Sequence, residues 1–181
     1  LATVPTGTYP EWVAYGNGYF MVANSWNTTG NTVTVINSTT LAVVTTITVD
    51  TYPRCIWYGW WKFAVGCFTN NSISIIDDTT LAVTSVINSV LRPVGILYAW
   101  WVRWVANRVV DTATFINATT NAIITTTPVW SWPSWIAYWN GKWAISNTGA
   151  WNTTIIDWST YAVLATVTGW ITWAWWYGTY V

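Results

Sequence analysis

Hydrophobic and polar residues alternate along much of this chain. In the stretch Thr32-Val33-Thr34-Val35, hydroxyl-bearing and aliphatic side chains take turns, which places them on opposite faces of an extended strand. Val, Ile, Thr and aromatic residues dominate such stretches, and Asn, Asp, Gly and Pro separate them. No stretch keeps the period of an amphipathic helix. The pattern therefore predicts an all-β protein.

The same pattern returns at a fixed interval. A pair formed by Ile and Asn or Asp recurs every 40 residues, beginning at Ile36, Ile76, Ile116 and Ile156. Each pair opens a polar turn, and a proline marks the start of each unit, at Pro10, Pro53, Pro93 and Pro133. Repeats of this length are stacked supersecondary units.

Each unit divides into four short strands, which is the composition of a propeller blade. The sequence predicts a single β-propeller domain over 1–181, with four-stranded antiparallel blades of about 40 residues at 9–51, 52–91, 92–131 and 132–171. The end segments 1–8 and 172–181 read as orphan strands, a last strand and a first strand of further units. Two architectures follow: an arc of a larger propeller, or ends that pair to close a ring or complete a neighbouring subunit.

Turn residues support this division. Asn17-Gly18 and Asn140-Gly141 are typical of two-residue hairpin turns, in which both residues adopt positive φ. Asn or Asp at the start of the longer polar turn, as at Asn37, can accept hydrogen bonds from the backbone two residues on.

The repeat also resembles a known family. Its motifs are Pro-x-x-Ile/Val-Ala-Tyr, then Asn-Gly-Lys, then a strand ending in Asn, then Val-Ile-Asn/Asp-x-Thr-Thr, and together they resemble the YVTN-type β-propeller repeat. The segments 20–24 and 143–147 stand where that family has Tyr-Val-Thr-Asn. The resemblance implies a propeller fold in a surface-layer, adhesion or periplasmic scaffold protein, and says little about activity. The chain departs from the family where Trp replaces Gly or Asx-Gly, at Trp12, Trp135, Trp60-Trp61 and Trp100-Trp101.

The 19 Trp residues admit three interpretations. They can form a rim that binds a ligand or a partner, for which the candidates are Trp60, Trp61, Trp100, Trp101 and Trp139. They can lie buried between blades, for which the candidates are Trp12, Trp57, Trp135 and Trp143. In the third interpretation, Trp is not the natural residue at the turn positions, because positive φ is sterically poor for a bulky side chain.

Charge and residue types exclude several functions. Charged residues make up 7% of the chain and sum to zero, so there is no basic field for nucleic acid or anionic lipid. No window has the apolar length of a membrane-spanning helix. The chain has no His, which excludes Ser-His-Asp and Cys-His catalysis and makes a zinc site improbable. We therefore expect no enzyme activity, no cofactor and no metal.

Two kinds of covalent feature are expected. Glycosylation sequons lie at Asn27, Asn37, Asn70, Asn117 and Asn152, and glycans would help to solubilise a chain with so few charges. Cys55 and Cys67 are six residues either side of Trp61, so a hairpin centred on Trp61 would place them opposite each other, within reach of a disulfide. Two buried free thiols are the alternative.

These observations favour an extracellular structural module. Such a module would be a subunit of a cell-surface layer, sheath or filament and would self-associate through propeller surfaces and strand edges. The alternative is a carbohydrate- or ligand-binding propeller that uses the rim Trp residues as stacking platforms.

Overall fold

The computed structural model describes residues 3–26 and 29–168, which form four antiparallel sheets of four strands each. Strand order within every sheet follows the sequence, so each repeat of about 40 residues is one sheet. This is a four-blade β-propeller fold, as the repeat predicted.

The blades have the following strands. Blade 1 contains β1 (Pro10–Gly16), β2 (Tyr19–Asn24), β3 (Thr32–Asn37) and β4 (Val43–Thr48). Blade 2 contains β5 (Pro53–Gly59), β6 (Lys62–Cys67), β7 (Ser72–Asp77) and β8 (Val83–Asn88). Blade 3 contains β9 (Pro93–Ala99), β10 (Val102–Asn107), β11 (Thr112–Asn117) and β12 (Ile123–Pro128). Blade 4 contains β13 (Pro133–Trp139), β14 (Lys142–Asn147), β15 (Asn152–Asp157) and β16 (Val163–Thr168).

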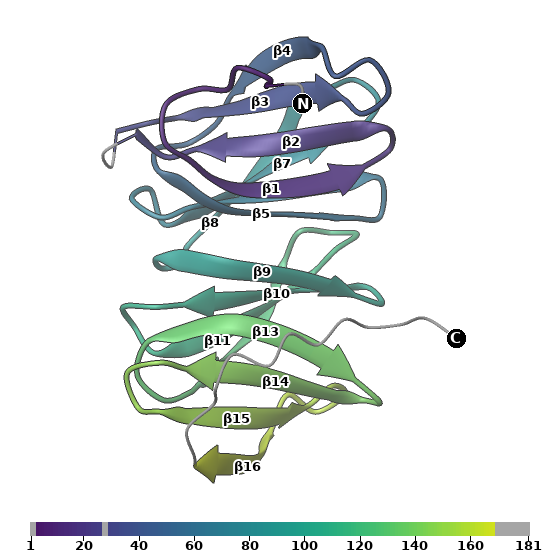
Figure 1. The fold of residues 1–181 in the computed structure, drawn as a ribbon. Helices are drawn as coiled ribbons and strands as arrows, with labels where there is room; N and C mark the ends of the chain where they lie inside the picture. Colours follow the sequence, from purple (N-terminus) through teal and green to yellow (C-terminus); the bar gives the residue numbers. More distant parts are fainter. Residues whose placement is uncertain (1–2, 27–28, 169–181) are drawn as a thin grey trace.

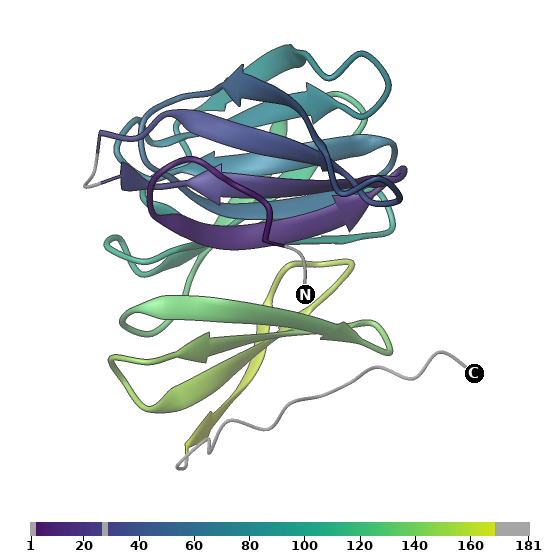
Figure 2. The same cartoon turned by 45° about the horizontal axis from the view of Figure 1, so that its top comes forward.

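The blades follow one another in chain order. First strands are neighbours, since β1 contacts β5, β5 contacts β9 and β9 contacts β13. In Figure 1, blade 1 extends from β1 to β4 at the top and blade 4 extends from β13 to β16 at the bottom, with β5 and β9 between them. Figure 2 shows the same layers with the top turned forward. The first and last blades thus lie at opposite ends of an arc.

Three hydrophobic cores lie between the blades. Blades 1 and 2 share a core that includes Met21, Val35 and Phe63, and blades 2 and 3 share one that includes Ile75 and Val105. The core between blades 3 and 4 is built around Trp104, Phe115 and Trp143. A blade therefore buries its two faces only by packing against neighbouring blades, which is the general behaviour of repeat proteins.

Tyrosine and glycine residues fix how closely the inner strands approach. A Cβ atom at Gly16 would lie 2.2 Å from the Tyr58 ring of the next blade, and one at Gly59 would lie 2.5 Å from the Tyr98 ring. Each ring thus packs directly on the backbone of the preceding blade. A larger residue at Gly16 or Gly59 would push two blades apart.

Buried asparagines tie the second strand of a blade to the third. Asn107 donates from Nδ2 to the hydroxyls of Thr112 and Thr114, at 3.0 and 2.7 Å. Asn24 and Asn147 make the equivalent pairs of bonds in blades 1 and 4. Blade 2 has Cys67 at this position, with its sulfur 3.8 Å from the Ser74 hydroxyl.

The polar turns between third and fourth strands form as the sequence predicted. Asn37 Oδ1 accepts from the backbone N–H groups of Thr39 and Thr40, each at 2.9 Å. Asp77, Asn117 and Asp157 repeat this arrangement. The side chain at this position closes the same turn in every blade.

The N-terminal segment takes the place of an inter-blade linker. Residues 3–8 form no strand, but the Gly7 N–H donates to Thr34 Oγ1 at 3.2 Å. The Asp50 N–H makes the same bond to Ser74 Oγ at 3.4 Å, where the chain passes from blade 1 to blade 2. The orphan strand expected at 172–181 lies outside the described residues. Within the described part of the chain, no helix is long and apolar enough to cross a bilayer.

The expected disulfide between Cys55 and Cys67 is not formed, and both thiols are buried and free. The β5–β6 turn has two central residues, Trp60 and Trp61, so Cys55 pairs with Gly66. A bulge between Pro53 and Cys55 makes Pro53 the partner of Cys67. Successive side chains of a strand point to opposite faces. Cys55 therefore lies in the core shared with blade 3, and Cys67 lies in the core shared with blade 1.

Candidate interaction surfaces

Tryptophan occupies two of the four turns between first and second strands. Trp60 and Trp61 have φ values of 53° and 59°, and Trp100 has a φ of 57°. The equivalent turns in blades 1 and 4 are Asn17-Gly18 and Asn140-Gly141, also at positive φ. Both turn residues thus have positive φ in blades 1, 2 and 4, as predicted from Asn-Gly, whereas in blade 3 only Trp100 does. The Trp residues adopt a left-handed region that bulky residues disfavour.

Three of the five predicted rim residues, Trp60, Trp61 and Trp101, lie together on blades 2 and 3. The Trp60 ring lies 4.9 Å from the Trp101 ring and 6.2 Å from the Tyr98 ring. With Tyr58 and Trp61, these residues line an open groove of about 370 Å³. Trp100 turns the other way, donating from Nε1 to the Tyr138 hydroxyl at 2.9 Å and stacking near Trp158. Trp139 is 80% exposed and lies outside the groove lining.

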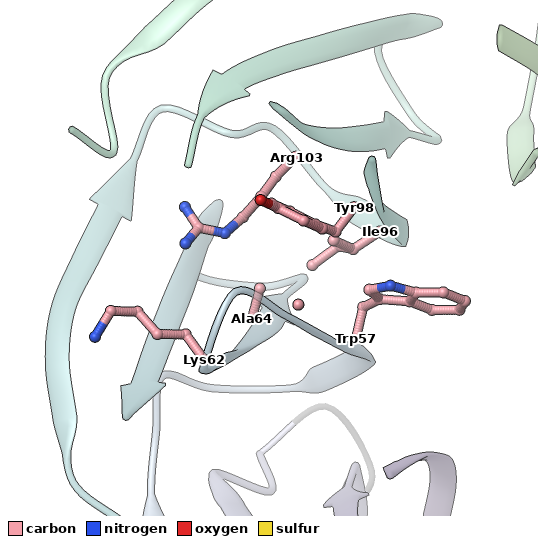
Figure 3. A pocket seen from close by; sticks show the side chains of 7 residues that line it. Trp57, Lys62, Ala64, Ile96, Tyr98 and Arg103 are labelled. Atoms are coloured by element: carbon pink, nitrogen blue, oxygen red, sulfur yellow. The ribbon is translucent and has the colours of Figure 1, made fainter. Parts of the chain in front are cut away.

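A second crevice lies between blades 2 and 3 and is too narrow to hold a water molecule (Figure 3). It is lined by Trp57, Lys62, Tyr98 and Arg103 with smaller residues between them. Arg103 is 2% exposed and donates to Asn121 Oδ1 at 2.7 Å and to the Ala118 carbonyl at 3.1 Å. Burial lowers the pKa of the Arg103 guanidinium from its usual value. Because its partners are neutral oxygens of its own blade, Arg103 serves to hold the β11–β12 turn.

The Trp residues expected between blades divide into two groups. Trp143 is buried and stacks on Trp104 with ring centroids 4.5 Å apart, and sequence reasoning missed Trp104 as its partner. Trp57 and Trp135 are instead 38% and 49% exposed, so the expected burial is wrong for them. Trp12 is partly buried, and its ring lies 4.8 Å from the Trp135 ring. This contact joins the inner strands of the first and last blades.

The forward face of blade 4 is uncovered. We call the face of a blade that points to the next blade along the chain its forward face. Four forward-face positions on the second and third strands are buried in every earlier blade, at Met21, Ala23, Val33 and Val35 in blade 1, at Ala64, Gly66, Ile73 and Ile75 in blade 2, and at Trp104, Ala106, Ala113 and Phe115 in blade 3. Their counterparts in blade 4, which are Ala144, Ser146, Thr153 and Ile155, are all partly exposed.

The backward face of blade 1 is uncovered in its inner part. Val13 is 58% exposed, whereas its counterparts Ile56 and Ile96 are 2% and 7% exposed against the preceding blades. Tyr15 is also 58% exposed. Residues farther from the axis on this face, such as Thr34, are covered by the segment 3–8. Val22 and Ile36 on the same face are also buried. The described residues thus leave the forward face of blade 4 partly exposed and the backward face of blade 1 open along β1, and faces of these two kinds pack together three times inside the chain.

The glycosylation sequons lie in different surroundings. Asn37 and Asn117 occupy equivalent polar turns and are partly exposed, and Asn70 is exposed in the β6–β7 turn. Asn152 is 5% exposed, and its Oδ1 accepts from Asn147, so it is less accessible than these three. Asn27 lies outside the described residues. Glycosylation stays a prediction at all five.

Hydrogen bonds and burial shift the pKa values of two acids and of both thiols. Hydrogen bonds from the Thr80 backbone, from Lys62 and from the Thr79 backbone lower the pKa of Asp77 to about 2, and bonds from Thr160 and Ser159 lower that of Asp157 to about 2. Burial raises the pKa of the Cys67 thiol to about 12, and burial also raises the pKa of the Cys55 thiol. Among the described residues, no group of three or more Cys, Asp or Glu could hold a metal ion.

Comparisons with known proteins give a fold and no family. No family model and no curated protein sequence matches this chain. Among solved structures, Kuenenia stuttgartiensis hydrazine synthase is similar with a TM-score of 0.79 and 15% identity, over 92% of this chain and 51% of that one. The computationally designed Ika8 protein is similar with a TM-score of 0.71 and 9% identity, over 87% and 49%. The chain therefore spans about half the length of these structures, and the likeness supports the propeller fold alone.

Proposed function

We propose that this chain is an extracellular structural module, of the YVTN type of propeller, that associates with copies of itself in a surface layer, sheath or filament. The observation that carries the proposal is the exposed surface on two blades, which is the forward face of blade 4 and the β1 part of the backward face of blade 1. Each is a copy of a face that is buried elsewhere in the chain. Burying apolar area of this kind is worth roughly 25 cal/mol per Å², so open faces favour association.

Two further features support an extracellular scaffold over a catalytic role. Charged residues are few, and three sequons lie at accessible turns, where glycans would shield an uncharged surface. The acidic side chains accept hydrogen bonds in turns or form ion pairs, as Asp77 does with Lys62 and Glu11 does with Arg54.

Light scattering across a concentration series tests self-association. We expect the average mass of the purified chain to exceed that of one copy, 20.4 kDa, and to rise with concentration. A constant mass of one copy up to the solubility limit would contradict the proposal.

The rim groove favours a second candidate, a carbohydrate-binding propeller. Exposed indole rings provide flat apolar platforms that suit sugar rings, and Trp60, Trp61 and Trp101 line a groove of suitable size. A glycan array read with wild type, Trp101→Ala and Trp139→Ala tests it. Binding that Trp101→Ala removes and Trp139→Ala preserves would support a lectin, because Trp139 is exposed but outside the groove. An array without binders would argue against it.

A further inference from the structure

The internal blade interfaces show which surfaces meet when two copies associate. In each of them, the forward face of one blade packs on the backward face of the next. In the core between blades 1 and 2, Met21 of the forward face and Ile56 of the backward face are both buried. The counterpart of Met21 in blade 4 is Ala144, and the counterpart of Ile56 in blade 1 is Val13. Val13 is 58% exposed and Ala144 is partly exposed.

We infer that two copies of this chain form a closed ring of eight blades, in which the forward face of blade 4 of each copy packs on the backward face of blade 1 of the other. This inference rests on the proposed self-association and adds the surfaces, the polarity and the number of copies. A second copy fits each exposed surface because it carries a face of the other kind, and faces of these two kinds pack together in the three internal interfaces.

The shape of the arc supports closure rather than an open filament. Blades 1 and 4 extend in opposite directions from the inner strands, at the top and bottom of Figure 1. The rings of Trp12 and Trp135 meet at 4.8 Å, so the inner strands of the first and last blades curve toward a common axis. A head-to-tail interface makes a ring when its rotation closes, and two half-turn arcs close after two copies.

The test uses one charge on each open face. Val13→Glu places an acid on the backward face of blade 1, and Ala144→Lys places a base on the forward face of blade 4. Light scattering should give two copies, or twice 20.4 kDa, for wild type and one copy for each variant alone. Mixing the two variants should restore the two-copy mass. In the mixed ring, one interface joins Glu to Lys and the other is wild type, so neither interface is broken.

A matched control separates the interface from general surface effects. Val109 is 60% exposed in the β10–β11 turn of an internal blade, and Val13 is 58% exposed. Val109→Glu should leave the two-copy mass unchanged. Circular dichroism should show folded protein for Val13→Glu, since the side chain it replaces is largely exposed in one copy.

The outcomes distinguish this inference from the proposed function. A wild-type chain that forms larger, open-ended assemblies overturns the closed ring and leaves self-association standing. A two-copy species that both variants preserve overturns the assigned faces and also leaves self-association standing. A wild-type chain that stays a single copy at every concentration overturns both.

Discussion

At the residue scale, the turn tryptophans are the positions least suited to their backbone. A left-handed conformation costs an L-residue about 1–2 kcal/mol, and Trp60 and Trp61 both adopt it. Their rings contribute some packing, since Trp60 contacts Trp101, but Trp61 is 69% exposed. The Asn-Gly turns of blades 1 and 4 form the same hairpin without this cost.

Replacing Trp60-Trp61 by Asn-Gly should therefore raise the free energy of unfolding, by about 1–2 kcal/mol in urea titrations. The control is Trp139→Gly, which also removes an exposed indole but lies in a strand, where glycine should destabilise by about 0.5–1 kcal/mol. A loss of stability in the Asn-Gly variant would show that the rim contacts outweigh the backbone strain.

The same residues separate the interpretations of the Trp-rich sequence. If glycine stands at these turns in the natural protein, its intact mass will be lower than the sequence requires. A native mass that agrees with 19 Trp would make the strain at Trp60 and Trp61 a property that the protein retains. Strain of this kind is typically kept at functional sites, which would favour a role for the groove.

At the scale of elements, the buried asparagines should stabilise the fold, because each one joins the second strand of its blade to the third. Asn107→Ala removes two hydrogen bonds between β10 and β11 and leaves the buried Thr114 hydroxyl and the partly buried Thr112 hydroxyl with fewer partners. We expect it to lower the free energy of unfolding by about 1–2 kcal/mol. Asn88→Ala, at the exposed end of β8, is the control and should change it by less than about 0.5 kcal/mol. Equal effects of the two would contradict the assigned role.

The polar turns predict an acid-sensitive step in stability. The folded-state pKa of Asp157 is about 2, below the unfolded value of about 3.9, so its contribution is complete above pH 4 and is lost as the pH falls toward 2. Asn37 and Asn117 close the same turn with a neutral acceptor. Asp157→Asn should therefore reduce the loss of stability between pH 4 and pH 2, and Asn117→Asp should increase it, as measured by thermal unfolding at each pH. Parallel pH curves for the three proteins would exclude this role.

Elements were more predictable than the contacts between them. The period of 40 and the turn residues located every blade because both act within one repeat. The Cys55–Cys67 pairing was wrong because the hairpin turns between Trp60 and Trp61 and not at Trp61, so Cys55 pairs with Gly66, and a shift of one residue moves a side chain to the opposite face. The exposure of Trp135 and Val13 depends on whether another blade covers them. Equivalent residues in neighbouring repeats have the same local sequence pattern whether they are covered or not, so the pattern did not predict this exposure.

At the scale of the whole molecule, association and stability should be linked. A species that forms only from folded copies is stabilised by mass action, so its melting temperature rises with protein concentration. Wild type should show this rise in calorimetry over a hundredfold range of concentration, because the second copy covers Val13 and the forward face of blade 4. Val13→Glu should melt at a temperature that does not depend on concentration, and Val109→Glu should behave as wild type. A concentration-independent melting temperature for wild type would mean that the open faces at the two ends of the arc do not hold copies together, and that blades 1 and 4 are stable with one face in water.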